Sequence, residues 1–181
     1  MEVALDTALA GKTVAILAEF NVEDSEFLYT RMRLIEAGAT VIVVGPHPAG
    51  MKYKGKHGVP FQSTHTIADV AAADIDGLIV PGGFAPDYWR RDERMKALVK
   101  DMDDAGKPIG TICHGPWLLI SAKILRGRTC TCFCAINDDV ENAGATLVQD
   151  QPVVVDRNLV TSRTPDDLPW FLRGFIAVMS A

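Results

Sequence analysis

Short apolar runs alternate along the chain with longer stretches in which apolar side chains recur at helical spacing. Runs rich in β-branched residues predict four buried strands, at 12–18, 40–45, 76–80 and 108–112. The stretches between and after them predict four helices, at 23–37, 92–105, 117–125 and 166–179. Two hairpins are predicted where β-prone pieces flank turn residues, at 51–64 and 152–161. We expect Thr164 or Asp166 to cap the last helix.

This alternation of strands and helices predicts one α/β domain over residues 1–181, with a mostly parallel central sheet between two layers of helices. Residues 1–11 precede the first strand as a short N-terminal extension. In such sheets, ligands bind beyond the carboxyl ends of the strands. The loops after Ala18, Val80 and Ile112 leave the sheet at that edge, so we expect their residues to converge.

The strand at 108–112 runs directly into Cys113, and the residues that follow predict a sharp turn with a thiol at its apex. Small residues two positions before and after the cysteine, Thr111 and Gly115, are what a strained nucleophile elbow requires. A thiol at a helix N-terminus lies at the positive end of the helix dipole, which favours the thiolate. We therefore expect an ionised nucleophile; the alternative is a buried structural cysteine.

Three further groups accompany this cysteine in the prediction. His114 acts either as a general base and acid or only through its backbone N–H. Gly82-Gly83 is a plain turn or, together with the N–H of His114, supplies the two donors of an oxyanion hole. Glu26 holds a proton beside the thiol if its side chain turns inward. If it points outward, it only complements the helix dipole, which is explanation enough for its neighbour Glu23.

Three more cysteines alternate with other residues in Cys130-Thr131-Cys132-Phe133-Cys134, which places their thiols on one side of a predicted strand. Zinc binding is one interpretation. However, residues i and i+2 of a strand are about 6.6 Å apart, and tetrahedral thiolate sites use a tight C-x-x-C turn. We favour small packing residues and expect no metal or other cofactor. A redox role beside an oxidised Cys113 is the alternative.

Composition narrows the classes of partner. The chain has 181 residues and a net charge of −5, with no basic stripe, so we do not expect it to bind nucleic acid. No apolar run approaches the roughly 20 residues that span a bilayer, and the start of the chain lacks the features of a secretory signal. Clustered cysteines are unlike a disulfide framework and favour a reducing, cytoplasmic location.

Several segments resemble the ThiJ/PfpI superfamily, and its PfpI-like branch most closely. They follow one another along nearly the whole chain: 19–29, Gly55-Lys56-His57-Gly58, Val80-Pro81-Gly82-Gly83, Ile112-Cys113-His114-Gly115-Pro116, Leu125-Arg126-Gly127-Arg128, 137–145 and 161–168. The resemblance implies a three-layer, flavodoxin-like sandwich that carries a cysteine nucleophile elbow.

The resemblance also implies roles for individual residues. Cys113 would be the reactive thiol, and Glu26 the carboxylic acid that touches it. The N–H groups of Gly83 and His114 would form the oxyanion site. In PfpI-like proteins an acidic residue of a neighbouring subunit can orient the histidine. The matching residue here is Asp87, which is shorter than the usual glutamate, so the completeness of a triad is in question.

Two residues depart from the pattern of the PfpI-like branch. Phe133 stands where archaeal members carry an active-site tyrosine, so any chemistry that needs a phenol hydroxyl is lost. Phe84 replaces a basic residue that is common in the branch, which weakens the case for anionic substrates. The resemblance also implies a homo-oligomer, a dimer or a hexamer. Tyr88 and Trp89 are candidates for exposed contacts between subunits; the alternative is ordinary packing at the start of a helix.

The fold does not by itself decide the reaction, because this superfamily hosts several. We expect a cysteine-dependent hydrolase or lyase with a stress-related role, acting on small reactive carbonyls or their protein adducts as glyoxalases and deglycases do. An intracellular cysteine peptidase is the first alternative. The second is a protein without enzymatic activity that senses oxidants through Cys113.

Overall fold

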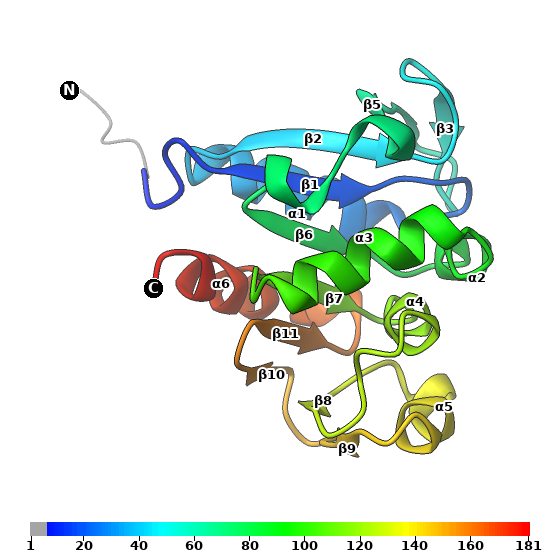
Figure 1. Ribbon diagram of the computed structural model, residues 1–181, viewed down its shortest axis with the longest axis vertical. Helices are drawn as coiled ribbons and strands as arrows, with labels where there is room; N and C mark the ends of the chain where they lie inside the picture. Colours follow the sequence, from blue (N-terminus) through cyan, green and yellow to red (C-terminus); the bar gives the residue numbers. More distant parts are fainter. Residues whose placement is uncertain (1–6) are drawn as a thin grey trace.

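Seven strands form the central sheet of the computed structural model, which describes residues 7–181 (Figure 1). In spatial order they are β10 (Val153–Asp156), β11 (Leu159–Ser162), β7 (Ile109–Ile112), β6 (Gly77–Val80), β1 (Thr13–Leu17), β2 (Thr40–Gly45) and β5 (His65–Thr66). Every neighbouring pair is parallel except the β10–β11 hairpin. The parallel strands therefore end together at one edge, on the right in Figure 1.

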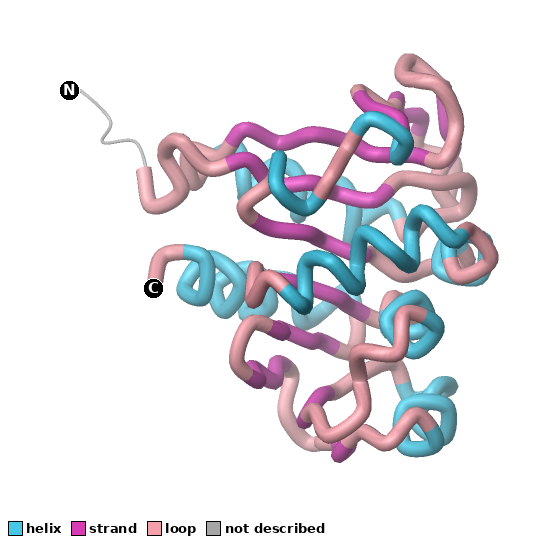
Figure 2. Tube along the Cα trace, viewed as in Figure 1, coloured by secondary structure: helices cyan, strands magenta, loops and turns pink. Residues whose placement is uncertain are grey.

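Helices cover both faces of this sheet (Figure 2). Helices α1 (Asp24–Glu36) and α6 (Leu168–Met179) pack together behind it, while α3 (Glu93–Asp104) and α4 (Pro116–Ser121) lie in front. Shorter helices complete the chain: α2 (Ala85–Trp89), α5 (Asn137–Asn142), η1 (Ile67–Asp69), η2 (Ala72–Asp74), η3 (Cys134–Ile136) and η4 (Pro165–Asp167). The remaining strands form two small sheets, which are β3 (Lys52–Lys54) with β4 (Pro60–Gln62) and β8 (Thr129–Cys130) with β9 (Thr146–Leu147). The flavodoxin-like sandwich and its mostly parallel sheet are confirmed.

The central strands are buried along their whole length, because helices shield both faces of the sheet. β6, β7 and β11 are buried at every position, and β1 at every position after Thr13. This burial explains why these strands appear in the sequence as continuous apolar runs rather than as alternating patterns. It also places the ends of β1, β6 and β7 at fixed positions under the loops that carry the candidate chemistry.

Two helix ends differ from the prediction. The helix expected at 117–125 ends at Ser121, because Lys123 adopts a left-handed φ of 61° and breaks the helical path. The last helix begins after a 3₁₀ turn, and neither Thr164 nor Asp166 caps it through a side chain. The carboxylate at its N-terminal end, Asp167, instead pairs with Arg163 at 2.9 Å.

The predicted strand through the three clustered cysteines is wrong. β8 ends at Cys130, and the chain then turns away because Thr131 N–H donates to Thr161 Oγ1 at 2.9 Å. Cys130 and Cys132 are buried, whereas Cys134 is exposed at the start of η3, so the thiols do not share one side of a strand. Within residues 7–181, no group of three or more His, Cys, Asp or Glu side chains is placed to hold a metal ion.

The expected exposure of Trp89 is also wrong. The side chain is 1% exposed, and its Nε1–H donates to the Ala18 carbonyl at 3.4 Å. The short α2 helix turns this ring into the core and leaves its neighbour Tyr88 on the surface. Of this pair, only Tyr88 is available for a contact between subunits.

The N-terminal extension is described from residue 7 onward, and residues 1–6 lie outside the described part. Leu9 is fully buried, and its N–H donates to the Ala37 carbonyl at 2.8 Å, so this segment packs against the end of α1. None of the described helices is long and apolar enough to cross a membrane.

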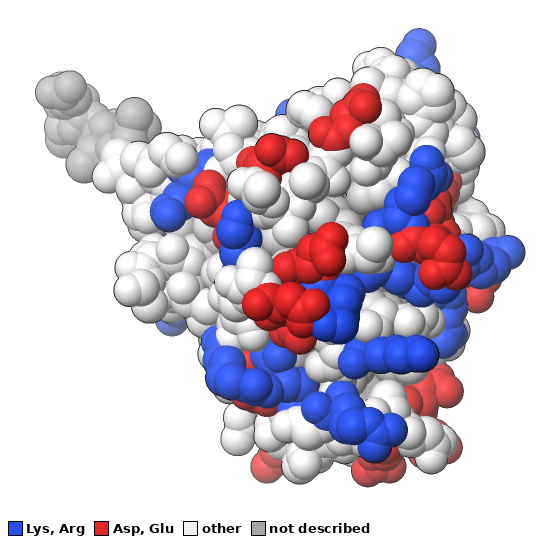
Figure 3. Space-filling view, viewed as in Figure 1, with Lys and Arg blue, Asp and Glu red and all other residues white. Residues whose placement is uncertain are grey.

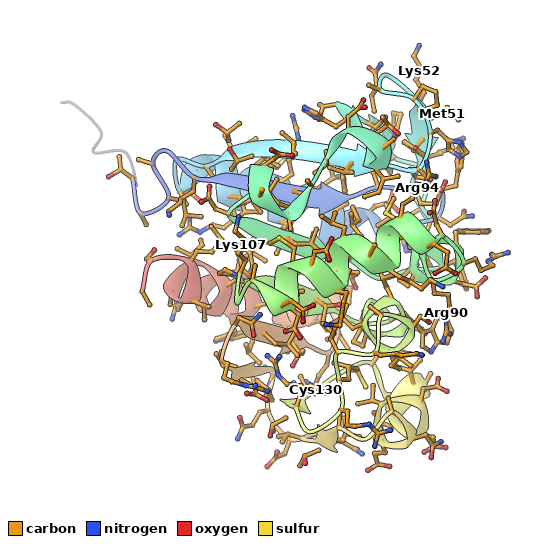
Figure 4. The ribbon with its side chains drawn as sticks, viewed as in Figure 1. Met51, Lys52, Arg90, Arg94, Lys107 and Cys130 are labelled. Atoms are coloured by element: carbon orange, nitrogen blue, oxygen red, sulfur yellow. The ribbon has the colours of Figure 1, made fainter. Side chains whose placement is uncertain are left out.

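Basic side chains lie near both ends of the sheet. Figure 4 places Lys107 at the end where β7 begins, where its Nζ donates to the Ala72 and Ile75 carbonyls at 2.6 and 2.7 Å. Arg90 and Arg94 lie near the opposite end, beside α2. On the face shown in Figure 3, basic and acidic side chains are interspersed, and neither sign forms one continuous patch.

Candidate active site

A cavity of about 340 Å³ opens at the carboxyl ends of the parallel strands. Its lining comes from the start of α1, the β3–β4 loop, the β6–α2 loop, the β7–α4 turn and the segments before η3 and in η4. These residues are Glu23, Glu26, Lys56, His57, Gly83, Phe84, Cys113, His114, Phe133 and Pro165. The predicted convergence of the loops after β1, β6 and β7 is therefore confirmed.

Cys113 is held at a sharp turn between β7 and α4. Its φ is 60°, in the left-handed region that non-glycine residues adopt rarely. Two backbone hydrogen bonds of 3.1 Å fix it, because Cys113 N–H donates to Ser162 O and Phe133 N–H donates to Cys113 O. A Cβ at Gly115 would collide with Thr111 Oγ1 and Val80 O, which explains the small residue there. The predicted elbow is confirmed.

Glu26 turns inward from the first turn of α1 and is completely buried. Its Oε2 accepts the Gly82 N–H at 2.6 Å, and the carboxyl also interacts with the Cys113 thiol. Burial raises the pKa of Glu26 to about 8, against the opposing effect of the Gly82 hydrogen bond. The carboxyl therefore carries a proton at neutral pH. The remaining oxygen, Oε1, has no partner among the described residues and is left to hold that proton.

Contrary to the expectation, the surroundings of the turn favour the neutral thiol of Cys113 over the thiolate. The residue is only 8% exposed, and burial raises the pKa of its thiol; above the pKa of Glu26, the charge of that carboxylate raises it further. Hydrogen bonds from the N–H groups of Gly83 and His114 oppose this shift without cancelling it. Desolvation outweighs the helix terminus, so the thiol needs a base to remove its proton.

His114 is placed to be that base. Its Nδ1 lies 3.2 Å from Cys113 Sγ, and its ring is packed between Trp117 and Phe133 at centroid distances of 5.1 and 4.9 Å. Burial lowers the pKa of the imidazole, and Lys56 adds to the effect, so the ring is neutral at pH 7. A neutral ring that carries its proton on Nε2 can accept the thiol proton at Nδ1.

Gly82 and Gly83 stand where a side chain would not fit, Gly82 against the elbow and Gly83 against the segment that precedes α1. A Cβ at Gly82 would lie 2.7 Å from Cys113 Cβ and 2.9 Å from Glu26 Oε2. Gly83 has a φ of 77°, and a Cβ there would lie 2.5 Å from Asn21 O. The N–H groups of Gly83 and His114 both reach the Cys113 thiol, which is the arrangement expected of two oxyanion donors.

Asp87 does not join the site within one chain. Its side chain is about half exposed on α2 and pairs with Arg91 at 2.7 Å. It does not line the cavity, and no described carboxylate is hydrogen-bonded to His114. A contribution of Asp87 to the site of a neighbouring subunit stays a prediction.

A polar group that the sequence pattern does not indicate, Glu23 with Lys56 and His57, also lines the cavity. Glu23 Oε2 lies 3.4 Å from Lys56 Nζ and 3.3 Å from His57 Nε2. The turn Gly55-Lys56-His57-Gly58 carries two signals, its basic residues and its likeness to the PfpI-like branch, but the sequence pattern predicts it only as part of a hairpin. Nothing in the local pattern shows that this turn lies against the start of α1.

Comparison with known proteins places the chain among relatives over nearly its whole length. A family model described as the DJ-1/PfpI family matches residues 12–178. The Escherichia coli K12 protein named protein/nucleic acid deglycase 2 is 45% identical over 172 residues, which cover 94% of this chain and 99% of the relative. General stress protein 18 of Bacillus subtilis is 42% identical over 170 residues, which cover 93% and 98%.

A solved structure agrees with these sequence matches. A two-domain protein of Anabaena variabilis, which contains DJ-1/ThiJ/PfpI-like and ferritin-like domains, has a TM-score of 0.89 and is 41% identical. The match covers 92% of this chain and 47% of that protein, so this chain spans about half of the larger one. The sandwich described above is therefore shared with that protein.

Proposed function

Because this chain belongs to the DJ-1/PfpI family, we propose that it is a cysteine-dependent hydrolase or lyase acting on small reactive carbonyls or their protein adducts. One observation carries the proposal. A buried thiol, Cys113, has a neutral imidazole nitrogen 3.2 Å away and a carboxyl whose pKa is raised to about 8 beside it. These are a nucleophile, its base and an acid in one cavity.

The first chemical step follows from these positions. As Cys113 Sγ attacks a carbonyl carbon, its proton passes to Nδ1 of His114 and the carbonyl π electrons move onto oxygen. The N–H groups of Gly83 and His114 stabilise that oxygen while its charge develops. The protonated Glu26 or the newly formed imidazolium then supplies a proton to it. The product is a hemithioacetal, and no other reactant is consumed.

Two observations favour small carbonyl substrates. The cavity of about 340 Å³ suits a substrate of a few carbon atoms or the end of a longer adduct. The relative in E. coli is named a deglycase of proteins and nucleic acids. For this chain, the absence of a nucleic-acid partner, the cytoplasmic location and the homo-oligomer stay predictions.

Methylglyoxal turnover tests the proposal. We expect the wild-type protein to convert it to lactate, and the Cys113→Ala variant to lose at least about a hundredfold in rate. Cys132→Ala is the matched control, because it removes another buried thiol and leaves the elbow intact. Lactate formation at equal rates in wild type and Cys113→Ala would refute the proposed chemistry.

The site also supports the second alternative, oxidation of Cys113. A protonated Glu26 with a free Oε1 can donate a hydrogen bond to a sulfinate formed on the thiol. The stress-protein name of the Bacillus subtilis relative agrees with such a role. Selective uptake of two oxygen atoms by Cys113 in mild peroxide, without carbonyl turnover, would favour it. The peptidase alternative agrees with the name of another Bacillus subtilis relative, putative cysteine protease YraA, which is 41% identical over 162 residues. Against it, Asp87 does not orient His114 within one chain.

A further inference from the structure

We propose that His57, oriented by Glu23, is a second base of this site and activates the water that releases the product from Cys113. This inference rests on the proposed function, because it concerns the second half of the same reaction. It assigns separate tasks to the two histidines that line the cavity, one serving the sulfur and the other serving water.

The imidazole rings of His114 and His57 have different partners. Nδ1 of His114 lies on the thiol, and no described carboxylate is hydrogen-bonded to that ring. His57 Nε2, by contrast, lies 3.3 Å from Glu23 Oε2. A carboxylate this close to Nε2 favours the tautomer with the proton on that nitrogen, which leaves Nδ1 free, and it offsets the positive charge that forms on proton uptake. Nδ1 of His57 has no other partner in the described part of the chain.

Hydrogen bonds hold the β3–β4 loop, which carries His57, against the start of α1. The Asp24 carboxylate accepts the N–H groups of His57 and Val59 at 2.7 and 2.8 Å. Lys56 N–H donates to Val22 O at 2.9 Å. A side chain at Gly55 would collide with Asp24, so the loop sits directly on the start of α1. A base on this loop keeps its position relative to the elbow.

Glu23 is shielded from water, whereas the His57 ring is open to it. Ser25 Oγ donates to Glu23 Oε1 at 3.2 Å, and Lys56 Nζ lies 3.4 Å from Oε2, so both carboxylate oxygens are engaged. The Glu23 side chain is 11% exposed, while the His57 ring is 62% exposed. The His57 imidazole therefore lines the cavity where water can reach it, and the Glu23 carboxylate beside it is shielded from water.

The step can be written for any substrate that leaves an acyl group on Cys113. An oxoaldehyde reaches the same thioester when its hemithioacetal shifts hydrogen internally. Nδ1 of His57 removes a proton from water, and the water oxygen attacks the thioester carbon. The carbon–sulfur bond then breaks, and its electron pair returns to Cys113 Sγ. The sulfur takes up a proton in place of the one that His57 took from water, and His57 releases that proton to solvent. The product is a carboxylic acid, and the free thiol is regenerated.

Hydrolysis of p-nitrophenyl acetate by the full-length protein separates the two halves. Acylation of Cys113 releases a burst of p-nitrophenolate, and deacylation sets the steady rate. We expect His57→Gln to keep the burst and to lower the steady rate by about 10²-fold, within the range for loss of a general base. Glu23→Gln removes the carboxylate beside His57 and is expected to lower the steady rate about tenfold while it keeps the burst. Intact-mass spectra would show the acetyl group accumulating on His57→Gln.

His47→Gln is the matched control. His47 is another exposed histidine near a buried carboxylate, 4.0 Å from Glu19, but it does not line the cavity. It should behave like wild type. An unchanged steady rate in His57→Gln, or loss of its burst together with the steady rate, would overturn this inference and leave the proposed function standing. Absence of a Cys113-dependent burst in wild type would overturn both.

Discussion

Two regions of this protein contain buried thiols, and they have very different surroundings. At the elbow, Cys113 has a left-handed backbone, two N–H donors, a protonated carboxyl and an imidazole nitrogen around one sulfur. In the segment from Cys130 to Cys134, the polar contact of Cys132 is a bond from Sγ to Asn137 Oδ1 at 3.4 Å. Cys130 lies on β8, in the lower part of Figure 4, far below α2.

Burial alone does not distinguish these thiols. It raises the pKa of Cys130 to about 11 and that of Cys132 to about 12, and it also raises the pKa of Cys113. The difference is that, among these three thiols, only that of Cys113 is in hydrogen-bond contact with groups able to move a proton, namely His114 and Glu26. In the proposed reaction, the thiol proton therefore passes to His114 during attack, rather than being lost beforehand to form a thiolate.

The largest effect should come from changing the donors at the elbow. Gly83→Ala adds a Cβ 2.5 Å from Asn21 O at a φ of 77°, so it must displace the N–H that faces the sulfur. We expect kcat for methylglyoxal to fall about 10²-fold, as when one oxyanion donor is lost. Gly106→Ala, with a φ of 65° and open space around its Cβ, carries the backbone strain alone. Equal activities of the two variants would remove the donors from the explanation.

A second effect is predicted on stability, through Glu26. Its pKa rises from 4.5 to about 8 on folding, so the folded protein binds more protons than the unfolded chain between these pH values. The contribution of Glu26 to the free energy of unfolding is therefore fully present below pH about 4.5 and is lost as the pH rises toward 8. Glu26→Gln removes this dependence, and its advantage over wild type should grow to a few kcal/mol at pH 8. Urea unfolding at pH 5 and pH 8 measures it.

Asn137→Ala is the matched control in the other region, because it removes the neutral partner of Cys132. Its difference from wild type should not change between pH 5 and pH 8. A Glu26→Gln curve parallel to that of wild type would show that the carboxyl is not protonated at neutral pH.

The smallest effect on activity should come from the second cysteine region. Cys130→Ala removes a fully buried sulfur, so we expect a loss of about 1 kcal/mol in the free energy of unfolding. The methylglyoxal rate should stay within a factor of two of wild type, because no group of the elbow contacts this residue. A large loss of turnover at unchanged stability would contradict the separation of the two regions.

Much of the architecture was predictable from the sequence. Buried parallel strands leave continuous apolar runs, and helices leave periodic ones, so β1, β2, β6 and β7 were found within a few residues. The elbow was visible because a strained turn needs small neighbours at fixed spacing, here Thr111 and Gly115. The 3₁₀ start of the last helix and the early end of α4 were not visible, since single backbone angles decided them.

Tertiary structure alone decided which side chains meet at the cavity. The sequence allowed Glu26 to point either way and assigned Glu23 to the helix dipole. Packing of α1 against the β3–β4 loop and the β6–α2 loop turned Glu26 toward Cys113 and placed Glu23 beside His57. The same packing excludes water from the elbow, and this desolvation raises the pKa values of Cys113 and Glu26. Helices and strands are determined largely by residues that are close together in the sequence. Desolvation and proton transfer depend instead on contacts between segments that are far apart in the sequence.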